Sequence, residues 1–280
     1  HNRQDCHRKP ETELDDFQTS YGTQSEGILR EYFPEACEEM RGMADGVGVH
    51  YERFSAWLMC ISVCLEVPGC SMIAVKDNGH VVFGRNNDLP PIFCRISASA
   101  LYRSSNGYSF IANSSAFVGA EDGINEKGLA AGMTYVWAKE LQPGINSMFF
   151  VRYILERCAT VEEGLKAIHG IPIGGAYHLI LADKDEIVHV ECSPQKIKID
   201  RGNFAVATNH FVSEEMKQYE EPKNLYLSRE RYRTGHDALT MGHSKEAPEY
   251  MKDILSGRLG FMCQYDKGLN FDTVWSSIYD

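Results

Sequence analysis

The sequence has no apolar run of about 18 residues, which is the length that a membrane-spanning helix needs. It also lacks an excess of basic residues, because 28 Lys and Arg stand against 39 Asp and Glu and give a formal net charge of −11. Phosphate backbones and anionic lipid headgroups repel an acidic protein. These two absences argue against a nucleic-acid partner and against a membrane partner.

Motifs that indicate a bound nucleotide cofactor or a metal ion are absent as well. The glycine-rich stretch 119–132 contains no GxGxxG, so a nucleotide fingerprint is lacking. No two cysteines form a CxxC pair, and His236 and His243 lack a tight metal-ligand spacing. We therefore expect no cofactor and no metal.

The cysteines are numerous, but their spacing shows no pairing pattern. They stand at positions 6, 37, 60, 64, 70, 94, 158, 192 and 263, and because their number is odd at least one has no disulfide partner within the chain. We expect mostly buried thiols that pack as small apolar groups, which favours a reducing compartment and a cytoplasmic location. Secretion stays open, because the chain begins at His1 and a cleaved leader would leave no trace. The strand-like segment 273–279 lies at the very end, so we also expect further C-terminal residues.

The composition suits a globular protein with a sizeable core. The chain has 280 residues, of which 43% are apolar, and this allows one large domain or at most two. Residues 1–20 are polar and are expected to be frayed. We find no repeat, low-complexity stretch or linker, and this favours one catalytic domain with a helical N-terminal segment.

Periodicity and turn signals predict an α+β layered fold. Helices are expected at 25–46 (with a break at Pro34), 52–63, 147–158, 161–169, 225–241 and 247–256. Strands are expected at 71–76, 80–86, 96–103, 108–115, 128–136, 177–183, 186–192, 196–200, 204–208 and 273–279. Pro68 and Gly69 break the pattern just before the first strand.

One hairpin brings reactive groups together. The dipeptide Asn78-Gly79 is a strong signal for a two-residue turn, because both residues tolerate positive φ. This turn pairs Asp77 with His80 and, further along, Cys70 with Asn87. A thiol from Cys70, the guanidinium of Arg85 and the carboxylate of Asp88 then meet at one strand end. A bland alternative remains open at this point, in which Arg85 and Asp88 form a surface ion pair and Cys70 is a buried thiol.

Short motifs in a fixed order resemble a known enzyme family. Gly69-Cys70-Ser71, followed by residues 84–88 (GRNND), resembles the start of the choloylglycine hydrolase and penicillin V acylase group. The sequence is still more similar to the acyl-coenzyme A:6-aminopenicillanate acyltransferase family. The further matches are residues 39–48 (EMRGMADGVG), 122–129 (DGINEKGL), 208–211 (TNHF) and 228–232 (SRERY).

This resemblance implies a four-layered αββα fold of the N-terminal-nucleophile hydrolases, and it implies self-cleavage. The Cys70 thiol would attack the Gly69–Cys70 bond and free Cys70 as a new N-terminus. Residues 1–69 would form a helical precursor segment that stays bound as a small subunit, and residues 70–280 would form the catalytic domain. A terminal cysteine is useful because its α-amino group titrates near neutrality and can serve as the base.

The resemblance also implies roles for individual residues. Asp88 would hold the new amino group, and Arg85 would lower the pKa of the Cys70 thiol. Asn209 would point its amide into the oxyanion hole. Arg231 would brace the site from behind, with Arg229 as a competitor for that role because the alignment around Ser228 is ambiguous.

One position departs from the family pattern and limits what the resemblance implies about specificity. Bile-salt hydrolases have Asn, and penicillin V acylases have Tyr, where this chain has Thr134. We place Thr134, Tyr135 and His210 at the substrate and oxyanion region, but transfer neither bile-salt nor penicillin specificity. His178 and His189 lie inside strand patterns and are interpreted as structural or surface residues, although a Cys–His dyad is the rival reading.

The expected function is a self-processing cysteine amide hydrolase that cleaves a non-peptide C–N bond of a small N-acyl compound. An acyltransferase that moves an acyl group from a coenzyme A thioester or amide to an amine is the close alternative. A non-catalytic, uncleaved binding module is a third. The expected partners are a small-molecule N-acyl substrate and the chain's own cleaved N-terminal segment, and a homo-oligomer is left open.

Overall fold

The computed structural model describes residues 14–64, 69–242, 244–266 and 270–280. Its α-helices are α1 (Asp16–Tyr32), α2 (Pro34–Val47), α3 (Tyr51–Cys60), α4 (Ser147–Arg157), α5 (Val161–Gly170), α6 (Ser228–Met241) and α7 (Ala247–Leu255). The short 3-10 helices among these residues are η2 (Pro91–Arg95), η3 (Lys217–Tyr219) and η4 (Leu225–Leu227).

The strands are β1 (Gly69–Asp77), β2 (His80–Leu89), β3 (Ala98–Tyr102), β4 (Phe110–Ser114), β5 (Asp122–Asn125), β6 (Ala130–Val136), β7 (Ala176–Ala182), β8 (Ile187–Cys192), β9 (Ile197–Gly202), β10 (Phe204–Ala207), β11 (Tyr265–Asp266) and β12 (Phe271–Tyr279). They form two sheets, one in the order β10-β1-β2-β12-β11 and the other in the order β3-β4-β5-β6-β7-β8-β9. Every pairing described within them is antiparallel.

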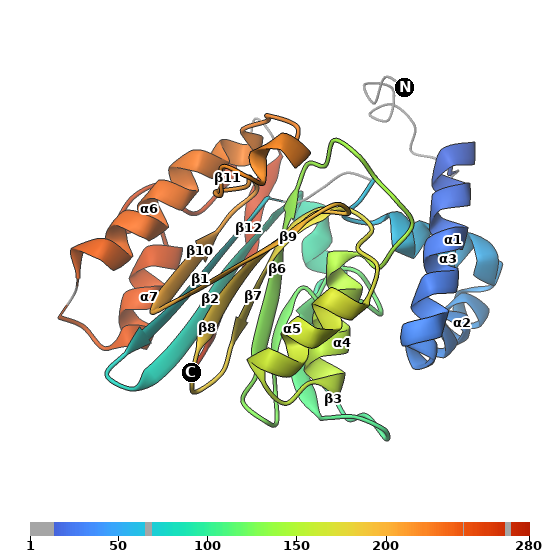
Figure 1. The fold of residues 1–280 in the computed structure, drawn as a ribbon, viewed down its shortest axis with the longest axis horizontal. Helices are drawn as coiled ribbons and strands as arrows, with labels where there is room; N and C mark the ends of the chain where they lie inside the picture. Colours follow the sequence, from blue (N-terminus) through green and yellow to red (C-terminus); the bar gives the residue numbers. More distant parts are fainter. Residues whose placement is uncertain (1–13, 65–68, 243, 267–269) are drawn as a thin grey trace.

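The two sheets pack face to face between two layers of helices. Met72 and Phe83 of the first sheet share a buried cluster with Ile180 of the second, which defines the space between the sheets. Ile73 and Val82, on the opposite face of the first sheet, pack against α6 and α7. Helices α4 and α5 cover the outer face of the second sheet (Figure 1). This is the four-layered αββα arrangement, so the predicted fold class is confirmed.

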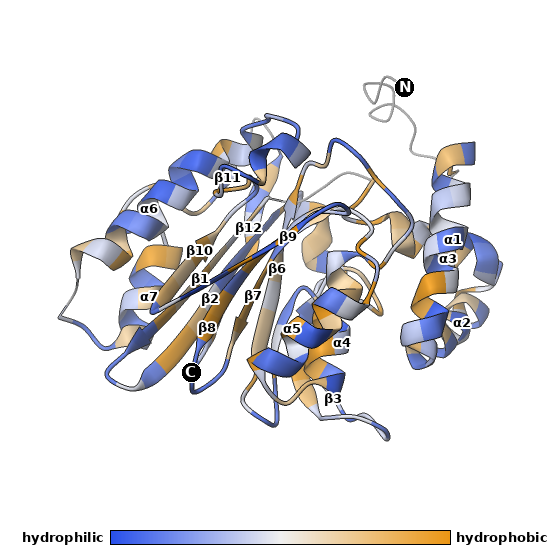
Figure 2. Cartoon of the chain, in the orientation of Figure 1, coloured by the Kyte–Doolittle hydropathy of each residue, from blue (hydrophilic) through white to orange (hydrophobic). Residues whose placement is uncertain are grey.

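Hydropathy along the chain follows these layers. The central strands are mostly apolar, whereas α6 and the N-terminal helices carry polar residues toward solvent (Figure 2). Strands β6, β7 and β8 are buried along their whole length, because each has a sheet on one side and helices on the other.

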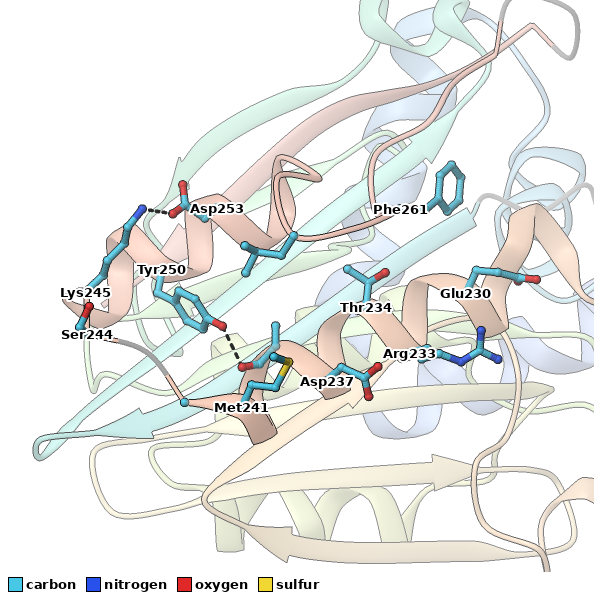
Figure 3. A pocket seen from close by; sticks show the side chains of 13 residues that line it. Glu230, Arg233, Thr234, Asp237, Met241, Ser244, Lys245, Tyr250, Asp253 and Phe261 are labelled. Carbon is cyan, nitrogen blue, oxygen red and sulfur yellow. Dashed lines mark hydrogen bonds and ion pairs between the residues drawn. The ribbon is translucent and has the colours of Figure 1, made fainter.

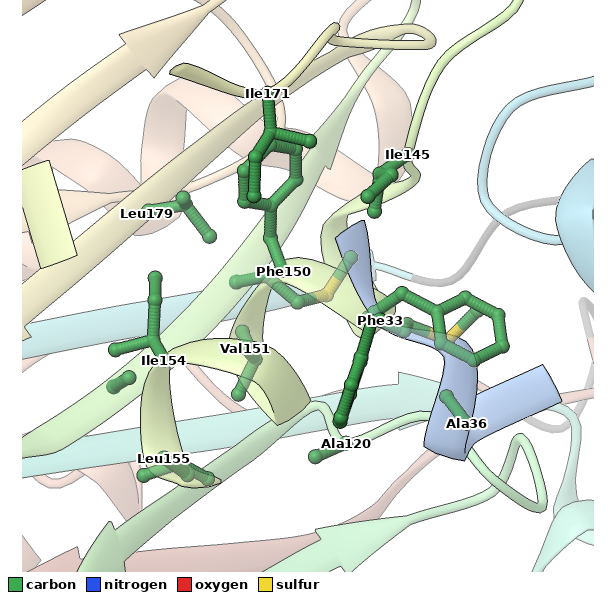
Figure 4. Close-up of a cluster of buried hydrophobic side chains, with 14 of the residues drawn as sticks. Phe33, Ala36, Ala120, Ile145, Phe150, Val151, Ile154, Leu155, Ile171 and Leu179 are labelled. Carbon is green, nitrogen blue, oxygen red and sulfur yellow. The ribbon is translucent and has the colours of Figure 1, made fainter. Parts of the chain in front are cut away.

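Helices α1, α2 and α3 form a separate bundle at one end of the molecule that shares its core with the second sheet's helical layer (Figure 1). Phe33 and Ala36 lie against Ile145 and Phe150 in a continuous buried cluster (Figure 4). An ion pair joins the same two regions, because Arg152 of α4 lies 2.9 Å from Glu39 of α2. The N-terminal segment is therefore fastened to the rest of the chain by both apolar and ionic contacts.

Two expectations about local structure were wrong. The polar residues after position 15 are not frayed, because Asp15 caps α1 by accepting from the amide of Gln18 while the Gln18 side chain accepts from the amide of Asp15. Strand β5, at 122–125, was not expected because a four-residue strand gives little periodicity. The expected break at Pro34 is confirmed, since Pro34 opens α2.

Two observations bear on the membrane-spanning helix and on the cysteines. Within the described ranges, none of the helices is both long and apolar enough to cross a membrane. The eight cysteines that the structure describes are all free thiols, and most of them are buried as expected. Cys6 lies outside the described residues, and so do Pro68 and His243.

Candidate active site

Cys70 lies near the start of β1, and its side chain points between the two sheets. The β1–β2 register pairs Cys70 with Asn87 and Met72 with Arg85, as the Asn78-Gly79 turn predicted. Because side chains alternate along a strand, Cys70, Met72, Arg85 and Asn87 share the inner face. Asp88 pairs with Gly69 and therefore lies on the opposite face, toward α6.

The Cys70 thiol is fully buried and held by two polar neighbours. Its Sγ accepts from Arg85 Nη2 at 3.1 Å and donates to Asn87 Oδ1 at 3.3 Å. Burial raises the pKa of the thiol to about 12, and the positive charge of Arg85 offsets part of that rise. The thiol is therefore protonated at neutral pH while the site is closed.

Arg85 is fixed from several directions. Its Nε donates to the carbonyl of Met133 at 2.9 Å, and Nη1 donates to Asp122 Oδ2 at 3.1 Å. Its Nη2 also lies 3.4 Å from Glu121 Oε2. These contacts leave the guanidinium little rotational freedom, so its charge is held against the Cys70 sulfur.

Asp122 connects this guanidinium to the C-terminal strand. Its Oδ1 accepts from Ser277 Oγ at 2.9 Å and from the Tyr279 hydroxyl at 2.6 Å. Its Oδ2 accepts from Trp275 Nε1 at 3.3 Å in addition to Arg85. The last strand of the chain thus supports the residue that orients Arg85.

Asp88 and Arg231 form the second half of the constellation, on the α6 side of β1. Asp88 Oδ2 lies 3.8 Å from Arg231 Nη1, and Asp88 Oδ1 accepts from Thr273 Oγ1 at 2.5 Å. Burial raises the pKa of the Asp88 carboxyl to about 6, although the positive charge of Arg231 pulls it down. Among the described residues, Asp88 Oδ2 and Asn87 Nδ2 are buried side-chain atoms without a hydrogen-bond partner.

Arg231 reaches the backbone of the nucleophile itself. Its Nη1 donates to the carbonyl oxygen of Cys70 at 2.5 Å and to Ser71 Oγ at 2.8 Å. Of the two arginines considered for this role, Arg231 is fully buried at the site. The side chain of Arg229 is 45% exposed and lies 3.8 Å from Glu220.

Asn209 joins Arg231 and Cys70 into one network. Its Oδ1 accepts from the Cys70 backbone amide at 3.0 Å and from Arg231 Nη2 at 2.7 Å, while its Nδ2 donates to the carbonyl of Tyr135 at 2.9 Å. Two donors on one side and an acceptor on the other define which way the amide points. Ser228 supports this position, because its hydroxyl oxygen accepts from the backbone amide of Asn209 at 2.7 Å.

The residues expected to line the substrate region lie close to Asn209 and its neighbours Thr208 and Ser228. Thr134 is fully buried, and its hydroxyl donates to the carbonyl of Thr208 at 2.5 Å. Tyr135 is also buried and contributes the carbonyl that Asn209 contacts. His210 Nδ1 shares a hydrogen bond with Ser228 Oγ at 2.7 Å. These three positions are thus close to Asn209 and Ser228, which hold the backbone at Cys70.

His178 and His189 are inside the protein and pair with each other, so of the two positions expected for them, structural or surface, they occupy the structural one. His178 Nδ1 lies 2.8 Å from His189 Nε2. Burial lowers the pKa of each imidazole to about 3, so both are neutral at physiological pH. The hydrogen bonds of Cys70 go instead to Arg85, Asn87, Asn209 and Arg231.

Gly69 sits in a tight aromatic setting. The rings of Tyr226 and Phe271 stack with centroids 3.8 Å apart. A Cβ at Gly69 would lie 3.0 Å from the Tyr226 ring and 3.3 Å from both Phe271 and the Asp88 Cβ. Tyr226 itself adopts φ 50°, and its carbonyl accepts from Arg231 and Gln264. The space before Cys70 therefore suits glycine.

Sequence reasoning gave no role to several residues of this network. Asn87 was placed opposite Cys70 by the hairpin register, and that register was the signal for its contact with the thiol. Asp122 lies in a motif that carried the family resemblance, but its role depends on β5 lying beside β6 and on β12 reaching across. Ser228 opens a motif that carried the resemblance, but its contact with Asn209 depends on tertiary packing. Thr273 also contacts the site only through tertiary packing, and local pattern holds no signal for it.

A separate hollow of about 620 Å³ lies between α6 and α7, on the outer side of the first sheet (Figure 3). Its lining includes Arg233, Asp237, Tyr250 and Phe261. Arg231, on the same helix, reaches Cys70, whereas Arg233 and Asp237 line the hollow. None of the residues that contact the thiol lines this hollow, so it is distinct from the candidate active site.

Comparison with known proteins adds the family. The family model described as acyl-coenzyme A:6-aminopenicillanic acid acyl-transferase matches residues 75–280. No curated protein matches the sequence.

Solved structures are similar at low sequence identity. Penicillin V acylase from Agrobacterium tumefaciens is similar with a TM-score of 0.50 and 19% identity, over 75% of this chain and 79% of that chain. A variant of conjugated bile acid hydrolase from Clostridium perfringens has a TM-score of 0.36 and 20% identity, over 52% of this chain and 55% of that chain. The first of these likenesses shows a shared fold.

Proposed function

The chain belongs to the acyl-coenzyme A:6-aminopenicillanic acid acyl-transferase family, and from this membership and the geometry at Cys70 we propose that it is a self-processing cysteine amide hydrolase. Its substrate is a small N-acyl compound with a non-peptide C–N amide bond. The family match begins at residue 75, after the nucleophile, so the chemistry of Cys70 is argued from its surroundings.

One observation carries the proposal. A buried thiol near a strand start lies 3.1 Å from a guanidinium that is itself held by Asp122, while Asn209 and Arg231 hold the backbone on either side of that thiol. A structural cysteine needs no fixed positive charge and no such support. A nucleophilic cysteine does, because the thiolate is the reactive form.

The first reaction is cleavage of the chain's own backbone. Cys70 Sγ attacks the carbonyl carbon of Gly69, the C–N bond breaks, and the proton of the thiol passes to the leaving nitrogen, which becomes the α-amino group of Cys70. Residues up to Gly69 then form a thioester with Sγ, and water hydrolyses that thioester to leave a free carboxylate and a free thiol. Arg231 supports this step by holding the carbonyl oxygen of Cys70 in place.

The mature enzyme repeats this chemistry on a substrate amide. The neutral α-amino group takes the thiol proton, the thiolate attacks the substrate carbonyl, the amine leaves, and water releases the acyl group. Arg85 stabilises the thiolate, and Asn209 Nδ2 donates to the developing oxyanion. Asp88 Oδ2, which is buried near Arg231, is placed to accept from the new ammonium group.

Burial explains why cleavage would be needed. Cys70, Arg85 and Asp88 have no exposed surface while Gly69 precedes the nucleophile in β1. Cleavage frees Gly69 from Cys70 and so opens a path for a substrate to the thiol. The small subunit stays bound, because α1, α2 and α3 share the buried cluster of Phe33 and Phe150 with the catalytic domain.

The family match favours a second outcome from the same acyl-enzyme. Members are described as acyl transferases, so an amine can replace water as the acceptor, with a coenzyme A thioester as the donor. The acyl-enzyme on Cys70 is common to both outcomes. Only the acceptor distinguishes them, and a site that excludes water favours transfer.

A mass-spectrometric trapping experiment tests the proposal. Purified full-length protein is incubated with a panel of N-acyl amino acids, penicillins, bile conjugates and acyl-amines, and with an acyl thioester plus an amine. We expect one substrate class to leave an acyl adduct on Cys70 in the fragment that begins there, and to be turned over.

The matched controls are Cys70→Ala and Cys94→Ala, since Cys94 is an exposed thiol. Turnover should vanish in the first variant and persist in the second. Turnover that survives in Cys70→Ala would overturn the assignment of the nucleophile. Product formation that requires the amine would identify the transferase outcome.

A further inference from the structure

A second cluster of side chains lies away from Cys70, where β7 and β8 pair. His178 stands on β7, and His189 and Glu191 stand on β8. One ligand atom from each of the three lies within 4.8 Å of the others. His178 Nδ1 is 2.8 Å from His189 Nε2 and 3.9 Å from Glu191 Oε1. The three side chains come from two paired strands and point toward one small volume.

Hydrogen bonding defines the tautomer of His178. Its Nε2 lies 3.0 Å from the carbonyl oxygen of His210, and a carbonyl only accepts. Nε2 of the neutral ring therefore carries the proton, and Nδ1 presents a lone pair toward His189 and Glu191. An imidazole held in this way by a backbone carbonyl is oriented as metal-binding histidines are.

His189 has a second acceptor as well. In the β8–β9 register it stands directly opposite Asp200, so the two side chains share one face of the sheet. When His189 donates from Nε2 to His178, its own Nδ1 lacks the proton. If an ion takes Nε2 instead, the proton moves to Nδ1, where the carboxylate of Asp200 is the nearby acceptor.

Glu191 is held without using up its coordinating capacity. Its Oε1 accepts from the backbone amide of Val212 at 2.5 Å, and Oε2 accepts from the amide of Ser213 at 3.2 Å. The amide of Ser213 also lies 3.3 Å from Oε1, so Oε1 has two backbone donors, whereas Oε2 has one and keeps a lone pair for an ion. These amides keep the buried carboxylate in position.

A route from solvent reaches this cluster. A cavity of about 200 Å³ is lined by His189, Asp200, Ser213, Tyr232 and His236, among others. His178 and Glu191 lie behind His189, so an ion entering from this cavity meets His189 first. The same cavity leaves room for a water molecule or a small anion on the open side of the ion.

We propose that His178 Nδ1, His189 Nε2 and the Glu191 carboxylate bind one divalent transition-metal ion of the zinc class. Two imidazoles and one carboxylate are a common ligand set for such an ion, with the remaining position open. Bond lengths of about 2.0–2.1 Å place tetrahedral ligands roughly 3.3 Å apart. The distances of 2.8 and 3.9 Å lie on either side of that value, so small side-chain shifts suffice.

This site is independent of the chemistry proposed at Cys70. It departs from the sequence-based expectation of no metal, because the β7–β8 register, which the sequence left open, places His178 opposite Glu191. The ion joins β7 and β8 to the backbone that carries His210, Val212 and Ser213. Its binding is therefore expected to stabilise that segment against unfolding.

The experiment titrates the full-length protein, stripped with chelator, with Co²⁺ as a spectroscopic probe and Zn²⁺ as competitor. We expect one Co²⁺ per chain, with visible d–d bands of nitrogen and oxygen ligation and without the intense near-ultraviolet band of thiolate ligation. We also expect a Co²⁺-dependent rise in melting temperature and displacement of Co²⁺ by Zn²⁺.

Two variants and a control identify the ligands. His189→Gln keeps an amide that donates to His178 Nδ1, and Glu191→Gln keeps an acceptor for Val212, so both are designed to fold. Each should weaken Co²⁺ binding at least tenfold, whereas His236→Gln, in the same cavity but outside the cluster, should leave it unchanged. Absence of stoichiometric binding up to millimolar Co²⁺ overturns the proposal. Binding that neither ligand variant weakens, or that shows thiolate ligation, overturns it too.

Discussion

Substitutions at Asn209 can separate positioning of Cys70 from stabilisation of the oxyanion, because the oxygen and the nitrogen of its side chain have different partners. Oδ1 accepts from the Cys70 amide and from Arg231, and Nδ2 donates to the Tyr135 carbonyl. The proposed mechanism assigns the second hydrogen of Nδ2 to the oxyanion. Asn209→Ala removes both functions, whereas Asn209→Asp keeps the oxygen acceptor and removes the amide donor.

The magnitudes follow from these contacts. Truncation to Ala takes a partner from the buried Cys70 amide and from the Tyr135 carbonyl, at about 1–3 kcal/mol for each group left unsatisfied. Loss of one oxyanion donor lowers kcat by about 10²–10³-fold, or roughly 2.7–4 kcal/mol. Asn209→Ala should therefore lose both stability and turnover. Asn209→Asp should lose turnover to a similar extent while it keeps its contact with Arg231.

The assay combines urea unfolding with kcat on processed protein, using the best substrate from the trapping panel. For a variant that processes too slowly to give mature enzyme, the first-order rate of self-cleavage replaces kcat. If Asn209→Asp turns over within threefold of the wild type, the amide is not an oxyanion donor, and Asn209 acts only by positioning Cys70. If Asn209→Ala is as stable as the wild type, the hydrogen-bond network described here does not support the fold.

Two further predictions concern Gly69 and Asp88. Gly69→Ala should slow self-cleavage, because its Cβ would meet the Tyr226 ring at 3.0 Å, whereas Gly27→Ala, where the space within 4 Å is empty, should leave the time course of intact mass unchanged. Equal rates would mean that the Tyr226 ring yields freely. For Asp88, burial raises the pKa from 3.8 to about 6, so the folded state binds this proton more tightly than the unfolded state does. Stability from this group is present below pH 4 and is lost as pH rises to about 6, by roughly 3 kcal/mol. In the uncleaved Cys70→Ala chain, the unfolding free energy of wild-type Asp88 relative to Asp88→Asn should fall by that amount between pH 4 and 7, and a pH-independent difference would refute the raised pKa.

Local sequence signals predicted the half of the site that a single hairpin builds. Asn78 and Gly79 both adopt positive φ, at 49° and 86°, and this turn sets the pairing of Cys70 with Asn87. Side-chain alternation then places Arg85 and Cys70 on one face. These two facts make Arg85 and Cys70 diagonal neighbours on that face, and Met133 and Asp122 hold the guanidinium against the sulfur.

The other half depends on contacts between segments far apart in the chain. Asn209 reaches Cys70 because β10 pairs with β1, and Arg231 reaches it because α6 packs on that same strand. Family resemblance pointed to both residues, but no periodicity did. His178 and His189 are 11 residues apart on neighbouring strands, and their contact was missed for a different reason: the expected strands 177–183 and 186–192 left the pairing register open, and that register sets the two imidazoles side by side.

The central claim is that the Cys70 thiol cuts the bond that precedes it, and intact mass measures this most directly. Wild-type protein and Cys70→Ala are purified in parallel and weighed under denaturing and native conditions. The account predicts two fragments from the wild type, 1–69 and 70–280, that remain associated in the native measurement, and one uncut chain from Cys70→Ala. A wild-type chain that stays whole while it turns over substrate, or a Cys70→Ala chain cut at Gly69, would contradict it.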